Sequence, residues 1–446
     1  MLLCFKTAAP WLLGAGLLMA APAWAQTPAI SDSLDLDGTL RSVLDANPAV
    51  TSLEEQVNAA AGRLAQTRTG LLPQVTGTAT YTYLNPVARA AFPAGPGGEI
   101  RELQFVPHNN YDAHITAQYL LLDFGRNAAT LSLSEAQRQT AQDNVTVARR
   151  DLAFTAAQTY YNILFMRESI RVQDEQVASL QVHRREMEKR VQGGVSTRFD
   201  VTTTDVRITQ AQNTKLDLEN QLRNQQVQLA RLLHKPQQTE VPVRGRLGYQ
   251  LQAVDLSAEL AKALENRPEV KLARDAERTA DLQLRLVEKS NLPSLGTGAQ
   301  VGGKNGFQPD INQFRANFTG VVQLSVPIYD GHKNRNQRVE ALANIRGQQA
   351  RTQDAQEQIR ADVRQAVNNL TYGQARFDNA TQQIAQATDA LTRARARYRY
   401  DVGTNLDVLD AETSLAQARL ARAQAMYNYT LGQFQLRRAT GEQIWQ

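Results

Sequence analysis

Two aspartates three residues apart, Asp407 and Asp410, are the clearest candidates for chemistry in this sequence. They lie in the stretch YDVGTNLDVLDA, just after Gly403, which breaks a long helical pattern. A spacing of three places both carboxylates on one face of a helix. Such a pair could be an acid pair for catalysis, a metal site, or a charged feature at the end of a helix. The choice depends on the elements that position the two side chains.

Motifs of enzymes and metal sites are absent from the sequence. A calcium loop needs the spacing D-x-[DN]-x-[DN]-G, which Asp401, Asp407 and Asp410 do not provide. The five histidines are scattered, and H-E-x-x-H, G-x-S-x-G, Walker A and a dinucleotide fingerprint do not occur. We therefore predict a protein that is not an enzyme, with no catalytic residue, no metal ligand and no cofactor.

The N-terminal segment has the pattern of a secretory signal peptide. Lys6 is its only charge, an apolar run follows, and Ala23–Ala25 fits an A-x-A cleavage site. We expect a signal peptide over residues 1–25 and a mature chain that begins at Gln26. The only cysteine, Cys4, lies inside the signal, so we expect no disulfide and no lipid-anchor cysteine in the mature protein.

The composition indicates an exported protein of long helices. Hydrophobic residues make up 42% and aromatic residues 6% of the chain, and alanine and glutamine are plentiful. The net charge is +5, but basic and acidic residues alternate along helical stretches, which favours solvated helix faces over nucleic-acid binding. After the predicted cleavage site no run of 18 or more apolar residues remains, so we expect no transmembrane helix.

The chain is predicted to be an internal repeat. Asp123 in LLDFGR and Asp200 in GGVSTRFDV are 77 residues apart, as are Asp330 in PIYDGH and Asp407 in GTNLDVLDA. The prolines of the NP and RP helix starts, Pro48 and Pro268, are each followed 25 residues later by another proline, Pro73 and Pro293. We therefore divide the chain into a first repeat, a linker or equatorial segment, and a second repeat, at residues 26–235, 236–255 and 256–442.

Each repeat is expected to hold one β-hairpin, at about 74–121 and about 297–326, because the hydrophobic period changes there from 3.6 to 2. Strands of about ten residues are long enough to cross a tilted bilayer. Four strands cannot close a barrel, and an open sheet edge is not tolerated in lipid, so several chains would have to share one barrel. Residues 85–110, rich in Pro and Gly, are expected to form a long exposed loop. Two ordinary hairpins in a soluble protein remain the alternative.

Long helices set this chain apart. Residues 126–191 contain neither proline nor glycine and keep a three-four hydrophobic spacing that indicates coiled-coil packing. At 1.5 Å per residue such a helix is on the order of 100 Å long. A rod of this length on a secreted chain is typical of a spacer or a tube wall. The remaining long helices are expected at 197–234, 334–400 and 405–440.

The sequence resembles the TolC family of outer-membrane efflux proteins over nearly the whole mature chain. The motifs that carry the resemblance are the NP helix start, LLPQV, LLDFGR with its echo PIYDGH, and YDVGTNLDVLDAETSLAQARLARAQ. The resemblance implies an α+β membrane protein that assembles as a homotrimer. Each protomer would give four strands to a twelve-stranded barrel in the outer membrane of a Gram-negative bacterium, and the long helices would continue as a coiled-coil barrel through the periplasm.

The resemblance also implies roles at the tips of the helical tunnel. Asp407 and Asp410 match aspartates that form acidic rings at the pore entrance, a field that favours cations. Asp200 and Tyr400 match positions of a gate between helices. The turns that contain these breaks would dock a periplasmic adaptor protein, itself joined to an inner-membrane pump of the RND or ABC type. The docking residues implied are Gly193, Gly194, Val195, Val402, Gly403 and Thr404.

The sequence departs from the family pattern at the second tip. Six residues separate Gly194 from Asp200 but only four separate Gly403 from Asp407, so the second turn is expected to be two residues short. An arginine common in the family is replaced there by Asn405. Helix capping is the alternative role for the aspartates that follow each turn, and a capping residue can also face a pore.

These observations predict an outer-membrane exit duct of a tripartite efflux or secretion system. One alternative keeps the fold and dedicates the duct to type I secretion of polypeptides. The other is a periplasmic coiled-coil scaffold that forms no pore.

Overall fold

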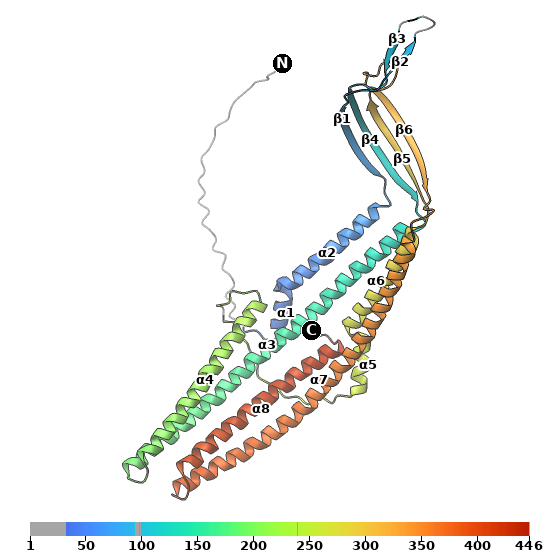
Figure 1. The fold of residues 1–446 in the computed structure, drawn as a ribbon. Coiled ribbons are helices and arrows are strands. Elements are labelled where there is room, and N and C mark those ends of the chain that lie inside the picture. Colours follow the sequence, from blue (N-terminus) through green and yellow to red (C-terminus); the bar gives the residue numbers. More distant parts are fainter. Residues whose placement is uncertain (1–32, 94–97, 99, 239, 446) are drawn as a thin grey trace, which may run out of the picture.

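The computed structural model describes residues 33–93, 98, 100–238 and 240–445. The predicted signal peptide and the predicted mature N-terminus lie outside the described residues. The molecule is a long, curved rod with a sheet at one end and two pairs of long helices at the other (Figure 1). No helix of the described part is both long enough and apolar enough to cross a membrane.

Two pairs of shorter helices form the middle of the rod, and their ends follow from the local sequence. Asp35 caps α1 (Leu36–Ala46) by accepting from the Gly38 N–H at 2.8 Å. The next helix, α2 (Pro48–Thr69), begins with a proline after the capping residue Asn47, where the missing N–H costs nothing. In the second half Asp255 caps α5 (Leu256–Asn266), and α6 (Pro268–Ser290) again begins with a proline.

The long helices come as two antiparallel pairs. In the first pair α3 (Arg126–Gln192) has 67 residues and is followed by α4 (Arg198–Leu232). In the second pair α7 (Lys333–Arg399) also has 67 residues and is followed by α8 (Asn405–Thr440). Both ends of α7 and the start of α8 lie 207 residues after their counterparts in the first pair. The two tips are therefore built at matched positions of the chain.

One antiparallel sheet holds all four of the longer strands, in the order β1-β4-β5-β6. Each half contributes a pair, and β4 bonds to β5 where the halves meet. The outer edges of β1 and β6 bond to no other strand among the described residues. The strands are β1 (Gln74–Tyr83), β4 (Asn109–Leu122), β5 (Ser294–Lys304) and β6 (Arg315–Ser325).

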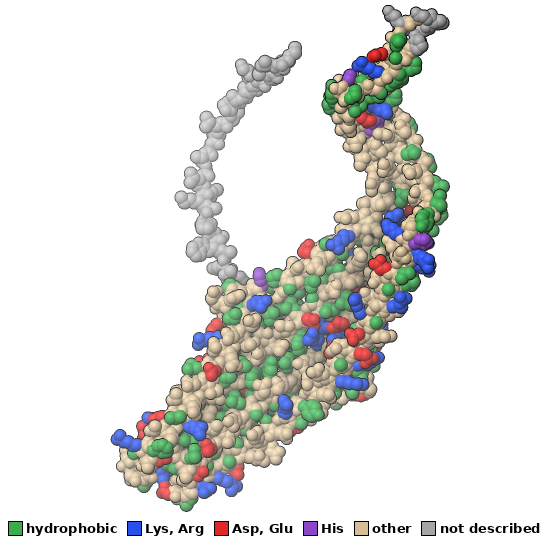
Figure 2. All heavy atoms as spheres, viewed as in Figure 1, with side chains coloured by type: hydrophobic (Ala, Val, Ile, Leu, Met, Phe, Trp, Pro, Cys, Tyr) green, Lys and Arg blue, Asp and Glu red, His purple; other side chains and the backbone are tan. Residues whose placement is uncertain are grey.

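The two faces of this sheet differ in chemistry. The strand register places Val75 beside Ala117, and Val301 beside both Ile115 and Phe318, so one face is apolar. Several of its large side chains are exposed, and Phe318 reaches 72%. The other face carries hydroxyl, amide and glycine positions, and few charged side chains appear over the middle of the sheet in Figure 2. Those positions include Thr76, Thr78, Thr116, Gln118, Gly298, Gln300, Gly302, Thr319 and Gln323.

The segment 85–110 differs from the expected open loop. It contains a small two-stranded ribbon of β2 (Arg89–Pro93) and β3 (Ile100–Gln104), which projects beyond the far end of the sheet (Figure 1). An ion pair between Arg89 and Glu102 and an edge contact between the rings of Phe92 and Phe105 join its two sides. These cross-strand contacts stabilise a ribbon in a segment whose Pro and Gly content had indicated a loop.

The linker of residues 236–255 crosses the middle of the rod and fastens the two helix pairs together. Leu34 and Val243 form a parallel bridge, and the Tyr160 hydroxyl of α3 donates to the Arg244 carbonyl. Four residues later the Gly248 carbonyl accepts from Thr430 of α8 at 3.0 Å. The linker thus spans from α3 to α8, over a core that includes Val241, Val243, Ile163 and Phe434.

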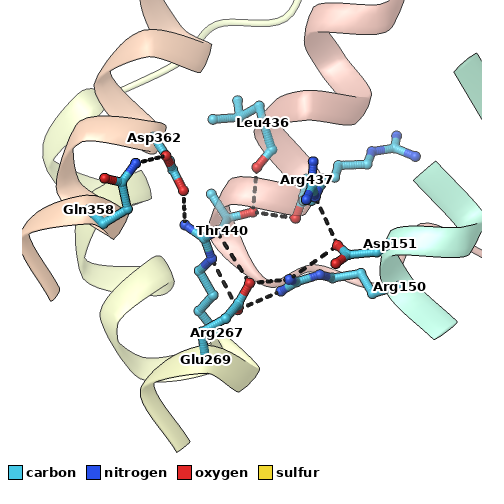
Figure 3. Close-up of polar contacts among 10 residues, drawn as sticks. Arg150, Asp151, Arg267, Glu269, Gln358, Asp362, Leu436, Arg437 and Thr440 are labelled. Carbon is cyan, nitrogen blue, oxygen red and sulfur yellow. Dashed lines mark hydrogen bonds and ion pairs between the residues drawn. The ribbon is translucent and has the colours of Figure 1, made fainter. Parts of the chain in front are cut away.

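A network of six charged side chains ties four helices together beside this core (Figure 3). Glu269 at the start of α6 accepts from Arg150 of α3 at 3.0 Å and from Arg267 at 3.2 Å. Arg267 also pairs with Asp362 of α7 at 2.6 Å. Arg438 of α8 donates to Asp151 of α3 at 3.0 Å. Three positive and three negative groups therefore balance, as a buried arginine such as Arg150 requires.

Candidate gate at the helical tips

The two tips have the same turn. Gly193 is the C-cap of α3, and Gly194 follows with a left-handed φ of 75°. The Val195 N–H then donates back to the Arg190 carbonyl at 2.9 Å. At the second tip Asp401 has a φ of 58°, and the Val402 N–H bonds to the Arg397 carbonyl at 3.0 Å. Both are Schellman-type helix ends.

The expected shortening of the second turn is therefore wrong. Gly194 and Asp401 occupy the same left-handed position, and each lies six residues before the aspartate of its tip, Asp200 or Asp407. The sequence comparison matched Gly403 to Gly194 because both are glycines. Aspartate can take this conformation, and it does so here, which leaves Gly403 just before the capping residue of the next helix.

Each tip aspartate closes a capping box. The Thr197 hydroxyl accepts from the Asp200 N–H at 3.3 Å, and the Asp200 carboxylate accepts from the Thr197 N–H at 3.1 Å. Thr404 and Asp407 repeat this arrangement at 3.2 and 2.9 Å. The capping alternative thus describes the local bonding of both aspartates, and it does not exclude a second role.

The bonding of these carboxylates holds them ionised. Burial of Asp200 opposes ionisation, but hydrogen bonds from Thr197 and Ser196 outweigh it and lower the pKa of this carboxyl. For Asp407 the backbone N–H and the hydroxyl of Thr404 lower the pKa. Both groups are therefore fixed negative charges at neutral pH.

Asp407 and Asp410 share an exposed face of α8 with Ser414 and Gln417. Further along α8, Thr430 and Gln433 donate to the linker. Counted with the 3.5-residue period of coiled-coil packing, the two aspartates lie on the side of α8 opposite to the linker. The Asp410 carboxylate also faces Arg207 of α4 at 3.3 Å. The pair therefore lies on one exposed face of α8, with Asp407 held in its capping box and the charge of Asp410 partly offset by Arg207.

Contacts between the two tips come from residues that the sequence alone did not single out. Arg190 of α3 forms an ion pair with Asp401, and its guanidinium lies 4.8 Å from the centre of the Tyr398 ring. The Tyr398 hydroxyl donates to the Met187 sulfur at 2.9 Å and lies 3.4 Å from the Ser196 hydroxyl. The sequence does contain one signal for the position of Asp401. Equivalent residues of the two tips are 207 residues apart, which makes Asp401 the counterpart of Gly194.

Asn405 makes a second connection between the tips. Its side-chain amide donates to the Asp200 carbonyl at 3.0 Å and to the Thr203 hydroxyl at 3.2 Å. Its side-chain oxygen lies 2.8 Å from Nε2 of the buried His183 on α3. The residue that stands in place of the family's arginine thus joins α8 to both helices of the other pair.

The predicted gate pair, Asp200 and Tyr400, is not hydrogen-bonded within this chain. The Asp200 carboxylate is bound to Thr197 and Ser196, and Tyr400 is 77% exposed. Of the predicted docking residues, Val195 and Val402 are 62% and 65% exposed at the outermost turns. Among the residues that the structure describes, no group of three or more His, Cys, Asp or Glu is placed to hold a metal ion.

Comparison with known proteins gives consistent matches. A family model described as "Outer membrane efflux protein" matches residues 39–234 and 260–442. The outer membrane protein TolC of Escherichia coli is 25% identical over 420 residues, which cover 89% of this chain and 80% of that protein. The alkaline protease secretion protein AprF of Pseudomonas aeruginosa is 23% identical over 342 residues, 75% of this chain and 70% of AprF.

A solved structure shares the fold. The crystal structure of the outer membrane protein VceC from Vibrio cholerae matches with a TM-score of 0.75 and 18% identity, over 92% of this chain and 96% of that one. At this level of identity the match concerns the arrangement of the helices and strands.

Proposed function

The chain belongs to the outer membrane efflux protein family, whose members are outer-membrane exit ducts and not enzymes, and we propose that three copies form one continuous channel. The observation that carries the proposal is the four-stranded sheet, which has an apolar face and two edges that pair with no other strand in the described part of the chain. Its strands have 10 to 14 residues, enough to cross a bilayer when tilted. In lipid the edge of β1 must be paired, and β6 of a second copy can pair with it.

Three such sheets give the twelve-stranded barrel that the family resemblance implies. The polar face, with its threonine, glutamine and glycine positions, would line the lumen, and the apolar face would meet the lipid. The two halves of the chain then act as a two-fold structural repeat, each supplying one strand pair and one long helix pair. From the sheet, helices of 67 residues extend about 100 Å, which suits a tunnel through the periplasm.

The tips would form the gated entrance of this tunnel. The side of α8 away from the linker would face the lumen, so three-fold symmetry would gather Asp407 and Asp410 into acidic rings. Within a protomer the ion pair of Arg190 with Asp401 and the contacts of Asn405 hold the two helix pairs together at the tip. We propose these contacts as the closed gate, with Asp200 as a backbone partner and the exposed Tyr400 available to a neighbouring subunit.

The partners would be a periplasmic adaptor and an inner-membrane pump of the RND or ABC type. The exposed valines at the two turns, Val195 and Val402, supply apolar contacts for the adaptor together with Gly193, Gly194, Gly403 and Thr404. Secretion of polypeptides is the second candidate function, and the similarity to AprF, a protease secretion protein by name, favours it. A strain in which the gene is deleted separates the two cargo classes. Its tolerance of small molecules tests efflux, and its set of secreted proteins tests secretion.

Planar-bilayer conductance of the purified mature protein tests the channel and its acidic rings together. We expect small, cation-selective steps from the wild type and reduced cation selectivity from the Asp407→Asn/Asp410→Asn double variant. Unchanged selectivity would limit both aspartates to capping and ion pairing while keeping the channel. Absence of conductance from folded protein, extracted without detergent, would favour a periplasmic scaffold and contradict the proposed function.

A further inference from the structure

A groove lies on the side of the helix bundle that carries the linker, just beyond the linker in the direction of the helical tips. Its volume is about 870 Å³, and its walls come from α3, the linker, α7 and α8. The α8 residues that line it, Arg419, Arg422 and Met426, lie on the same side of that helix as Thr430, which bonds to the linker. The groove is therefore on the opposite side of α8 from Asp407 and Asp410 and is separate from the proposed lumen.

Two of the five arginines that line this groove are neutralised inside it. Arg171 donates to Glu168 at 2.9 Å and pairs with Glu175 as well. Arg419 donates to the other oxygen of Glu175 at 2.7 Å. Both glutamates of the groove lie on α3 and are thus occupied, and they hold one guanidinium group of α3 and one of α8 in place.

The other three arginines have no carboxylate partner among the described residues. Arg167 donates to the Val243 carbonyl at 2.5 Å, which leaves its positive charge uncompensated. Arg246 is exposed on the linker, and Arg422 lies 5.6 Å from the centre of the Phe377 ring. The groove therefore carries a net charge of about +3 and has guanidinium donors on three of its walls, a setting that favours carboxylate or phosphate groups.

The remaining lining is apolar. Leu247 of the linker, Ile384 of α7 and Met426 of α8 supply part-exposed aliphatic and thioether surface, and the buried Leu164 and Val172 of α3 lie beneath it. A small hydrated anion would leave this surface in water, whereas a ligand with an apolar body would cover it. The volume matches that of sites for drug-sized ligands.

We propose that this groove binds amphiphilic anions, that is, small molecules with a carboxylate or phosphate head and an apolar body. The head would bridge Arg246 and Arg422, and the body would lie against Leu164, Ile384 and Met426. A membrane lipid is the less suitable source of such a ligand, because Leu164 is 38 residues, or about 57 Å, along α3 from the sheet end at Arg126. The ligand is therefore a free solute.

Isothermal titration calorimetry with 2-naphthoate tests this site on the purified mature protein in a neutral detergent. We expect one site per chain, weakened as salt rises, and at least a tenfold loss of affinity in Arg246→Gln/Arg422→Gln. Tenfold corresponds to about 1.4 kcal/mol, close to the lower limit for a single hydrogen bond to a charged group. Arg351→Gln is the matched control, since Arg351 is an exposed arginine of α7 about 50 Å away along the helix.

Further ligands separate the parts of the proposal. 2-Naphthalenemethanol, which has the body without the charge, and acetate, which has the charge without the body, should each bind far more weakly. Equal binding of acetate, or an affinity for naphthoate that the double variant leaves intact, would overturn the site. Binding confined to an acidic peptide or to phosphatidylglycerol vesicles would overturn it in favour of a protein or lipid ligand. Because these measurements need no transport, their outcome is independent of the proposed channel function.

Discussion

Arg190 of α3 and Asp401 of the second tip form an ion pair between the two helical hairpins. Asp401 owes its position to the left-handed turn that it shares with Gly194, and Arg190 is steadied by the ring of Tyr398. The pair therefore couples the shape of one turn to the position of the neighbouring hairpin. Asn405 and Tyr398 also join the hairpins close to their ends, and the ion pair is the contact among these that a single charge removal can break.

Asp401→Asn should open the tip without unfolding the turn. Asparagine tolerates the left-handed conformation as well as aspartate does, but it removes the charge that faces Arg190. A partly exposed pair contributes about 1 kcal/mol, so the ratio of closed to open tips should fall about fivefold. The measurement is the mean single-channel conductance in planar bilayers, which we expect to rise.

Asp389→Asn provides the control for that experiment. Asp389 pairs with Arg393 one helical turn away at 2.8 Å, within α7, so its loss removes an equal charge without touching the contact between hairpins. Equal conductance changes in both variants would contradict a gate role for Arg190 and Asp401.

Arg207→Gln should increase the cation selectivity of the entrance. Arg207 faces Asp410 at 3.3 Å and offsets part of its charge, so the amide would leave Asp410 fully negative beside Asp407. The reversal potential in a salt gradient measures this change. An unchanged reversal potential in Arg207→Gln would contradict this prediction. A shift of the same size in an Asp410→Asn background would also contradict it, because the two residues would then not act on the permeating ions as a pair.

The sequence predicted the family and the outer-membrane location, and both are confirmed. Helices such as α3 and α7 are specified locally by long apolar periodicities, and strands such as β6 by alternating polar and apolar residues. These elements can therefore be predicted without knowledge of the tertiary fold. Contacts between hairpins are different. Arg190 and Asp401 are 211 residues apart, and their meeting depends on how four helices pack. No short motif encodes that packing.

The tip turn shows a second limit of sequence reasoning. A glycine is the usual signal of a left-handed helix end, so Gly194 was matched with Gly403 instead of with Asp401. The periodic offset of the repeat carried the correct match, because it is set by whole helices and not by one residue type. Likewise, the role of Asn405 at the tip follows from His183 and Asp200, neither of which is near it in sequence.

Acid should stabilise the packing of α6 on α3 through Asp275. Burial, together with the neighbouring Asp143 of α3, raises the pKa of Asp275 to about 6. Lys271 bonds to Asp143 at 2.7 Å, and Lys271 and Arg278 of α6 compensate Asp275 only in part. A carboxyl whose pKa is raised by folding binds its proton more tightly in the folded state. Its contribution to stability is therefore full below pH 4 and is lost as the pH rises through about 6.

Thermal unfolding followed by circular dichroism at pH 5 and pH 8 checks this sign. Relative to Asp275→Asn, the wild type should lose stability between the two values, because the variant cannot ionise. Asp281→Asn is the control, because Asp281 is a carboxylate on the same helix that pairs with Arg285. The difference in thermal stability between pH 5 and pH 8 should be the same in this variant as in the wild type. A wild-type protein that gains stability over this range relative to Asp275→Asn would refute the assignment.

Gly302→Ala should prevent assembly of the sheet, whereas Gly77→Ala should not. Gly302 of β5 lies beside His114 of β4, whose Nε2 reaches over it to Asn317 of β6 at 2.7 Å. A β-carbon at position 302 would overlap the Ala113 carbonyl oxygen and lie 2.7 Å from the His114 Cα, so the backbones of β4 and β5 would have to separate. At Gly77 of β1 a β-carbon meets nothing within 4 Å. The yield of protein extracted from outer membranes, and its resistance to unfolding in detergent, should therefore fall for Gly302→Ala alone. Equal yields from the two variants would show that the strands can part at this point, and the tie between His114 and Asn317 would then not be needed for the sheet.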